Sequence, residues 1–175
     1  MSEFRYDSYC GLYCGACDIL VAYKNGLETG TTPQWSDLPP EFANNLPFNA
    51  QKAEIKCYGC KTDTVFAGCS KCFIRKCARK KVGIETCLDC ERYPCYRVKI
   101  MAFAKKLLKI ETKLPHLKAI ASNIEVIKNN GVQFWLEEQQ RKWQCPHCGK
   151  RLSWYRASCP DCNSHGEQPD SFSVR

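Results

Sequence analysis

The density of cysteines between residues 57 and 95 limits how this chain can fold more than any other feature. The cysteines form three C-x-x-C pairs, and two of the pairs extend to C-x-x-C-x-x-x-x-C. Few apolar residues lie between them, so apolar burial alone cannot offset the chain entropy lost on folding. A crosslink is needed, and the spacing indicates metal. The eight residues are Cys57, Cys60, Cys69, Cys72, Cys77, Cys87, Cys90 and Cys95.

Metal is favoured over disulfides by the number and the repetition of the cysteines. There are 15 in all, an odd number, and the C-x-x-C spacing occurs six times. Disulfides also need an oxidising compartment, whereas the first residues lack the basic and apolar regions of a secretory signal. No stretch approaches the roughly 18 apolar residues of a transmembrane helix. We therefore expect a cytoplasmic metal protein.

A second group of cysteines, Cys10, Cys14 and Cys17, has the spacing C-x3-C-x2-C. Radical-SAM enzymes share this spacing, but their large α/β barrel needs alternating strands and helices that this sequence lacks. Residues 1–100 thus hold 11 cysteines, whose all-sulfur ligation fits either zinc or [4Fe–4S] clusters. Because a zinc ion or a [4Fe–4S] cluster usually takes four cysteines, 11 cysteines divide into two groups of four and one group of three. We expect one site with only three cysteine ligands, most simply the N-terminal group.

The C-terminal cysteines form the most specific motif in the sequence. Cys145, Cys148, Cys159 and Cys162 have the spacing C-x2-C-x10-C-x2-C, with a proline inside each pair. Two such pairs facing each other build one closed tetrahedral site of structural type. The motif predicts a zinc ribbon, although the same ligands also suit a single iron ion.

The remaining segments predict a small α+β, cysteine-rich and metal-stabilised fold. We expect a metal-binding domain over 1–100 (with an insertion at 27–53), a helical segment over 101–142, a ribbon over 143–163 and a disordered tail over 164–175. A short strand is expected at 54–56. Helices are expected at 18–24, 73–81, 96–110, 117–127 and 132–143. The first should end before Gly26, and Gly131 should separate the last two.

The helix at 96–110 carries an apolar stripe of Tyr96, Ile100, Phe103, Leu107 and Ile110. Such a stripe is typical of a helix that packs on a core, and much less often of one that lies on a membrane surface. We interpret it as a core stripe and expect no membrane partner. His116 follows in a break between helices, where we expect it to be solvated.

The formal charge of +8 is weak evidence for an acidic partner, because metal binding deprotonates the cysteine thiols. A local basic run is a candidate anion-binding face. No aromatic residues alternate with it as in single-strand nucleic-acid sites, so a solvated face is favoured. The loop of the ribbon, with Arg151 and Trp154, is a second candidate for nucleic acid. The run comprises Arg75, Lys76, Arg79, Lys80 and Lys81.

Several short motifs together resemble a known family. These are C-G-L-Y-C-G-x-C at residues 10–17, C-x-G-C at 57–60, C-F-I-R-K-C-A at 72–78, C-x-x-C at 87–90 and Y-P-C at 93–95. Over about residues 8–100 the chain resembles the prokaryotic cysteine-rich proteins of domain-of-unknown-function family 3795. Longer members are similar also in the terminal ribbon. The resemblance implies metal binding, and it implies no particular activity.

The sequence favours a metal-binding protein that serves as an interaction or assembly module for another protein. The first alternative is an iron–sulfur protein for electron transfer or cluster delivery. The second is a nucleic-acid-binding zinc protein. No catalytic triad, phosphate loop or H-E-x-x-H motif is present, so a role other than catalysis is favoured.

Overall fold

The structure, a computed structural model, describes residues 3–46, 49–156 and 158–164. Within these residues the protein is almost entirely helical, and the β structure consists of one isolated antiparallel bridge between Gln144 and Arg151. The predicted α+β class is therefore not confirmed. The strand expected at 54–56 is absent, because no β-pairing forms at these residues. Of the disordered tail expected at 164–175, residues 165–175 lie outside the described residues.

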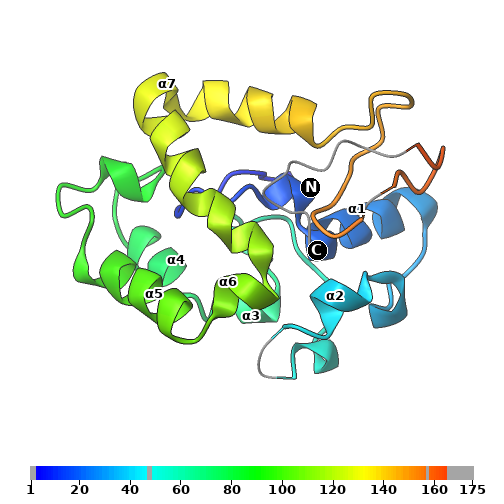
Figure 1. The fold of residues 1–175 in the computed structure, drawn as a ribbon, viewed down its shortest axis with the longest axis horizontal. Helices are drawn as coiled ribbons and strands as arrows, with labels where there is room; N and C mark the ends of the chain where they lie inside the picture. The colour runs from blue at the N-terminus through cyan, green and yellow to red at the C-terminus, as the bar shows by residue number, and fades with distance from the viewer. Residues whose placement is uncertain (1–2, 47–48, 157, 165–175) are drawn as a thin grey trace.

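Twelve helical segments follow one another along the described chain, most of them short (Figure 1). In order they are η1 (Cys14–Ala16), α1 (Asp18–Thr29), η2 (Trp35–Asp37), α2 (Pro40–Ala43), η3 (Ala50–Lys52), α3 (Ala67–Ser70), α4 (Phe73–Ala78), η4 (Cys87–Asp89), α5 (Tyr96–Leu107), α6 (Ile110–Lys113), η5 (Pro115–Lys118) and α7 (Ala119–Lys142).

Helix α1 starts directly after Cys17 and is longer than predicted. Asp18 occupies its first turn, where a carboxylate is favourable against the helix dipole. The helix passes through Gly26, which is buried, and ends at Gly30, whose φ of 70° is left-handed. The prediction that Gly26 terminates the helix is wrong, because the later glycine supplies the conformation that ends it.

The predicted break at Gly131 is confirmed. This residue has a φ of 86° and a ψ of 165°, so it interrupts α7 and divides it into two helical parts that meet at a sharp bend (Figure 1). The sequence Asn129-Asn130-Gly131 favours this bend, because glycine adopts positive φ without a steric penalty. The first part runs from the α6 region, and the second leads to the C-terminal cysteines.

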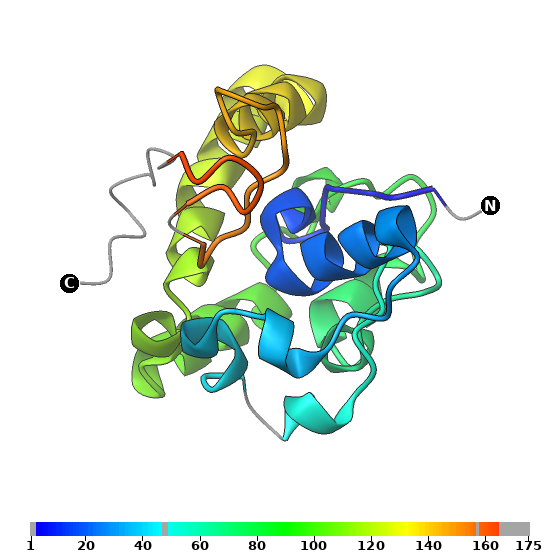
Figure 2. The ribbon, with the colours of Figure 1, turned by 90° about the vertical axis from the view of Figure 1, so that its right-hand side faces the viewer.

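The C-terminal segment packs on the start of the chain rather than apart from it (Figure 2). Tyr13 and Ala16 share a core with Trp135 from α7 and with Leu152 and Trp154 from the terminal segment. A backbone hydrogen bond of 2.9 Å joins the Trp154 nitrogen to the Ala16 oxygen. The two ends of the chain therefore form one continuous hydrophobic core.

A second core lies on the other side of α1. Ile19 and Leu20 pack there with Leu38 and Phe42 of the region predicted as an insertion, and with Phe66. Helix α2 is a single turn that begins at Pro40, within a segment (39–46) whose sequence allows one or two helical turns. Residues 27–53 thus contribute apolar side chains to the core.

The apolar stripe of α5 is not buried, and its interpretation as a core stripe is wrong. Phe103 and Leu107 are each 66% exposed, and Tyr96 and Ile100 are also exposed. The helix packs through its opposite side, where Met101 contacts a small core. None of the described helices is both long enough and apolar enough to span a bilayer.

Candidate metal centres

The four C-terminal cysteines converge on one point. The sulfurs of Cys145, Cys148, Cys159 and Cys162 all lie within 4.8 Å of one another. The Sγ atoms of Cys145 and Cys162 are 3.5 Å apart, and those of Cys148 and Cys159 are 3.4 Å apart. Zinc with Zn–S bonds of about 2.3 Å holds its sulfurs about 3.8 Å apart, so this donor set fits one tetrahedral ion.

Two turns of the same design present these sulfurs. In each turn the residue directly after the second cysteine donates a backbone hydrogen bond to the first cysteine. Gly149 N–H donates to Cys145 O and Asn163 N–H donates to Cys159 O, both at 2.9 Å. Gly149 (φ 71°) and Asn163 (φ 55°) both adopt the left-handed conformation. Glycine and asparagine accept this conformation most readily, which explains why they follow the cysteines here.

A hydroxyl group favours the thiolate form in this centre. The Ser164 side chain lies 3.1 Å from the sulfur of Cys145, and this contact lowers the pKa of Cys145 to about 5. The thiolate is the form that binds metal. The Lys150 ammonium and the Asp161 carboxylate, 3.3 Å apart, join the two turns. The group is therefore preorganised to take a cation.

A second group of four cysteines lines a surface cavity at the start of α5. Its ligand atoms come from α4, η4 and the residue before α5. The cavity encloses about 370 Å³ of empty space, its open mouth included. We call this group the outer centre; it comprises Cys77, Cys87, Cys90 and Cys95.

The electrostatics of the outer centre differ between its inner and exposed edges. Burial raises the pKa of Cys87 to about 12, and the charges of Cys10 and Cys95 add to this. At the exposed edge the Lys81 ammonium lies 2.9 Å from the sulfur of Cys90 and lowers the pKa of this thiol. Lys81 thus favours the thiolate form of Cys90, whereas burial disfavours the thiolate form of Cys87.

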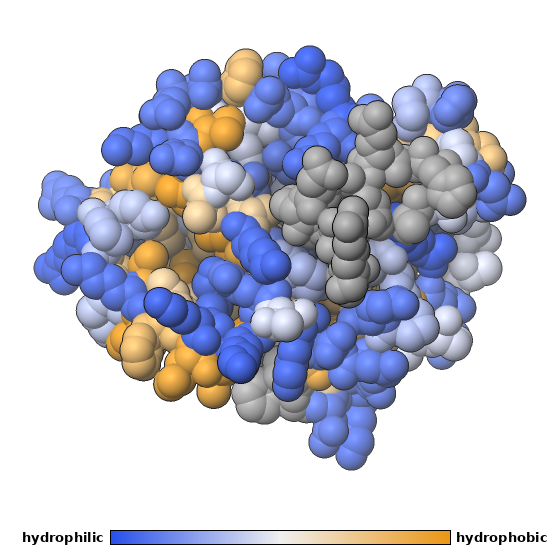
Figure 3. Space-filling view, viewed as in Figure 1, coloured by the Kyte–Doolittle hydropathy of each residue, from blue (hydrophilic) through white to orange (hydrophobic). Residues whose placement is uncertain are grey.

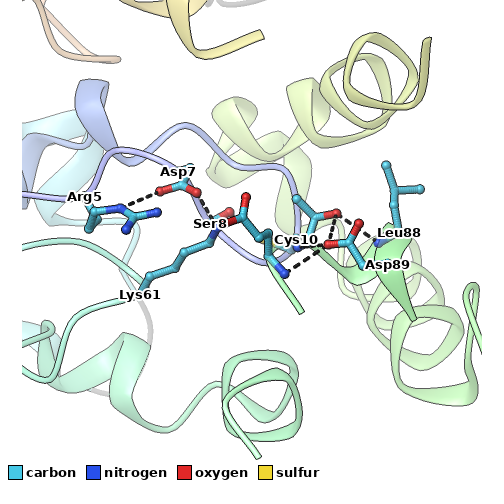
Figure 4. Close-up of polar contacts among 9 residues, drawn as sticks. Arg5, Asp7, Ser8, Cys10, Lys61, Leu88 and Asp89 are labelled. Atoms are coloured by element: carbon cyan, nitrogen blue, oxygen red, sulfur yellow. Dashed lines mark hydrogen bonds and ion pairs between the residues drawn. The ribbon is translucent and has the colours of Figure 1, made fainter. Parts of the chain in front are cut away.

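A cap holds the loop that carries Cys87 and Cys90. The Leu88 N–H donates to Thr86 Oγ1 at 3.2 Å, and the Thr86 N–H donates to a carboxylate oxygen of Asp89 at 2.6 Å. Figure 4 shows Leu88 and Asp89 in these contacts, with Cys10 nearby. This reciprocal arrangement fixes the short η4 turn, and with it the positions of both sulfurs.

The other seven cysteines of the family-like region gather in a basin beside α1, which we call the inner basin. Burial raises the pKa of Cys14 and of Cys17 well above the ordinary value. The charge of Cys60 raises the pKa of Cys14 further, and the charge of Cys57 does the same for Cys17. The structure thus brings the N-terminal group together with later cysteines. The basin comprises Cys10, Cys14, Cys17, Cys57, Cys60, Cys69 and Cys72.

Cys10, a member of the inner basin, also interacts electrostatically with the outer centre. Its charge contributes to the raised pKa of Cys60 in the basin and to that of Cys87 in the outer centre. Ser8 Oγ is 3.4 Å from its sulfur, and the buried Asp7 carboxylate is paired nearby with Lys61 (Figure 4). The two groups of cysteines are thus linked by charge interactions through Cys10.

The spacing of these 11 sulfurs differs from that of the C-terminal four. Within the described residues, no three of them lie within 4.8 Å of one another. One ion requires short separations, whereas a [4Fe–4S] cluster holds its four sulfurs farther apart because each binds a different iron. All-cysteine donor sets occur both with zinc and with iron–sulfur clusters.

Three of the five basic residues predicted as an anion site make contacts within the chain. The buried Arg75 donates from Nε to Cys60 O and from Nη2 to Thr62 O, both at 2.7 Å. Arg79 pairs with Asp63, and Lys81 contacts the outer centre. The other two, Lys76 and Lys80, are exposed on α4 and just after it. The helix predicted to extend to residue 81 ends at Ala78.

His116 was expected to be solvated but is buried. Its ring stacks on Trp154 with centroids 4.0 Å apart and planes 8° apart, and its Nδ1 is 2.8 Å from the Tyr155 hydroxyl. Burial lowers the pKa of His116 to about 3, so the ring is neutral. No local signal near residue 116 predicts this position, because both partners come from the terminal segment.

Asp18 is a second buried polar residue that the sequence does not reveal. Ser153 Oγ donates to its Oδ1 at 2.6 Å, while Oδ2 is buried without a hydrogen-bond partner. Burial raises the pKa of Asp18 to about 7. The residue thus holds the terminal loop against the start of α1, directly after Cys17.

Comparison with known proteins places these centres in a family. Residues 6–100, more than half of the chain, match the family described as protein of unknown function, DUF3795. The chain belongs to this family. The match contains the inner basin and the outer centre, while the C-terminal four-cysteine group lies beyond it. No curated protein and no solved structure matches the chain.

Proposed function

We propose that the DUF3795 region of this chain holds [4Fe–4S] clusters and that the protein transfers electrons. The outer centre would hold one cluster near the surface, and the inner basin would hold the others. All-cysteine ligation is the usual ligation of such clusters. Under this proposal, the chain of cysteines through Cys10 connects interior and surface sites.

The observation that carries the proposal is the contrast in sulfur spacing. The C-terminal cysteines meet within 4.8 Å, whereas no three of the other 11, all of them described, do so. One protein chain thus presents two kinds of thiolate site under the same conditions. This supports clusters in the family region and a single ion at the C-terminus.

We assign zinc to the C-terminal group, with a structural role. Four cysteines close the coordination sphere, which leaves no position for a substrate. Cys145 and Cys159 are also part of the core that contains Trp135 and Tyr13. In this role the ion stabilises the packing of the terminal segment on the rest of the protein.

Anaerobic purification tests the proposal. We expect iron and acid-labile sulfide in equal amounts, about one zinc per chain, and a broad absorption band near 400 nm that dithionite bleaches, as iron–sulfur ligation predicts. Dithionite should also produce a paramagnetic resonance signal. Zinc alone, at three or four ions per chain and without sulfide, would exclude the electron-transfer proposal.

A matched pair of variants assigns the metals to their sites. Cys77→Ser removes a ligand of the outer centre and should lower iron and sulfide while zinc stays constant. Cys148→Ser removes a ligand of the C-terminal group and should lower zinc. The opposite pattern would show that the assignment of the two metals is reversed.

A further inference from the structure

An exposed apolar surface lies along α5, next to the outer centre. We call it the α5 face. Figure 3 shows apolar side chains gathered at the surface where α5 lies in Figure 1. All five of its residues are more than half exposed, which is unusual for so many large apolar side chains on one short helix. They are Tyr96, Ile100, Phe103, Leu107 and Leu108.

Basic residues surround the α5 face. Residues 96–118 contain seven lysines and arginines and one acidic residue, Glu111. Glu111 pairs with Lys105 at 2.7 Å. In the described part of the chain no carboxylate pairs with Lys99, Lys106 or Lys109. An apolar centre with an unneutralised basic rim is complementary to a partner with an apolar centre and an acidic rim.

The α5 face also adjoins the outer centre. It starts at Tyr96, which directly follows Cys95, and Arg97 and Val98 of the same helix line the cavity of the centre. The Arg97 guanidinium lies 5.0 Å from the centroid of the Tyr96 ring. A protein bound to this face would therefore lie beside the outer centre, whose cavity opens to the surface.

We infer that the α5 face is the docking site of an acidic one-electron carrier protein. This inference rests on the proposed electron-transfer function and names its partner. The step is the passage of one electron from the reduced flavin or cluster of the carrier to a cluster of this chain, and no bond is made or broken. Charge complementarity orients the encounter, and the apolar contact stabilises the complex.

Binding of two acidic carriers to the iron-loaded protein tests the inference. The probes are a plant-type ferredoxin and a flavodoxin, measured by calorimetry at low and at physiological salt. We expect at least one to bind, with an affinity that falls as salt rises. Phe103→Ser and Lys106→Glu should each weaken binding about tenfold or more, as for residues at the centre of an interface.

Two matched variants serve as controls. Phe134→Ser removes an exposed aromatic side chain from the far part of α7, and Lys128→Glu reverses an exposed charge on the same helix. Both should leave the affinity unchanged within about twofold. Iron content and circular dichroism of all four variants should match those of the wild type.

Three results would overturn the inference. The first is that neither carrier binds at low salt. The second is that vesicles of anionic phosphatidylglycerol bind instead and lose binding in Phe103→Ser. The third is a dimer in sedimentation that Phe103→Ser abolishes. The absorption spectrum of the same sample separates this inference from the proposed function: clusters without carrier binding overturn the docking site alone.

Discussion

Ser153 and Asp18 are 135 residues apart in sequence and are joined by a hydrogen bond of 2.6 Å. Both side chains are buried, and the second carboxylate oxygen of Asp18 has no partner. This contact links the terminal segment to the residue that follows Cys17. The C-terminal metal group and the inner basin are thus mechanically connected.

Removal of this hydroxyl should destabilise the protein. In Ser153→Ala both oxygens of a buried carboxyl group lack a side-chain donor, so we expect a loss of about 1–3 kcal/mol in the free energy of unfolding. Urea titration of the metal-loaded protein measures it. A further change of Asp18→Leu should restore part of the loss. The control Ser122→Ala, at an exposed hydroxyl, should cost less than about 0.5 kcal/mol. Equal costs for Ser153→Ala and Ser122→Ala would show that the hydrogen bond to Asp18 does not stabilise the fold.

Acid sensitivity should depend on His116. Its pKa is about 3 in the fold and about 6.5 when unfolded, so the unfolded chain binds more protons between these values. The associated stability is fully present above pH 6.5 and is lost as the pH falls toward 3, at up to about 1.4 kcal/mol per unit.

The variant His116→Gln isolates this contribution, because carboxyl and thiol groups titrate in both proteins. We expect the wild type to be more stable at pH 7.5 and the difference in unfolding free energy to shrink as the pH is lowered to 5. Denaturant titrations at four pH values measure it. A difference that is constant with pH would show that the fold does not lower the pKa of His116.

The sequence predicts the features that depend on neighbouring residues. Gly131 breaks α7 because glycine alone adopts its conformation cheaply, and the C-x2-C turns place Cys145 and Cys148 by local geometry. The burial of His116 and the exposure of Phe103 depend on which distant segments meet. Periodicity shows that α5 has an apolar side, but does not show whether another element covers it.

The grouping of the cysteines could likewise not be predicted. Cys10 and Cys14 are neighbours in sequence, yet Cys10 also lies next to Cys87, and Cys14 next to Cys60. C-x-x-C spacing fixes which two sulfurs act together locally. It does not determine which pairs combine, because that depends on the tertiary path of the chain.

Arg75 should stabilise the loop that carries Cys60. Arg75→Ala removes the donor to Cys60 O and one of two donors to Thr62 O, which also accepts from Arg79 Nη1 at 3.2 Å. The change should cost about 2–3 kcal/mol, as for hydrogen bonds from charged groups. Lys76→Ala, at the exposed neighbour, should change stability by less than about 0.5 kcal/mol. Thermal unfolding of both variants gives the comparison. Similarly small stability changes in Arg75→Ala and Lys76→Ala would mean that Arg75 has no structural role.

Loss of the C-terminal ion should affect more than its own segment. In Cys148→Ser we expect about one zinc fewer per chain and a stability loss of about 3 kcal/mol or more, because binding of a structural ion is coupled to folding. Trp135 and Trp154 lie in the same core as Cys159, so tryptophan fluorescence should shift as well. A loss of zinc with an unchanged fluorescence spectrum would indicate that the terminal segment stays packed without its ion.

Gly59 should be the least replaceable glycine of the metal-binding region. It lies between Cys57 and Cys60 with a φ of 115°, and a Cβ there would be 1.8 Å from the backbone oxygen of Arg5. The Arg5 N–H donates to Tyr58 O at 2.8 Å, so the first described residues lie directly on this turn. An alanine would have to displace backbone, not a flexible side chain.

We therefore expect Gly59→Ala to cost more than about 4 kcal/mol and to deplete the metal of the inner basin. Gly83→Ala is the matched control: its φ of 73° is also left-handed, but nothing lies within 4 Å of the added Cβ. It should cost only the conformational strain, about 1–2 kcal/mol, and retain full metal content. Metal analysis and urea unfolding of the pair separate steric displacement from strain, and equal costs would contradict the contact between Arg5 and the turn.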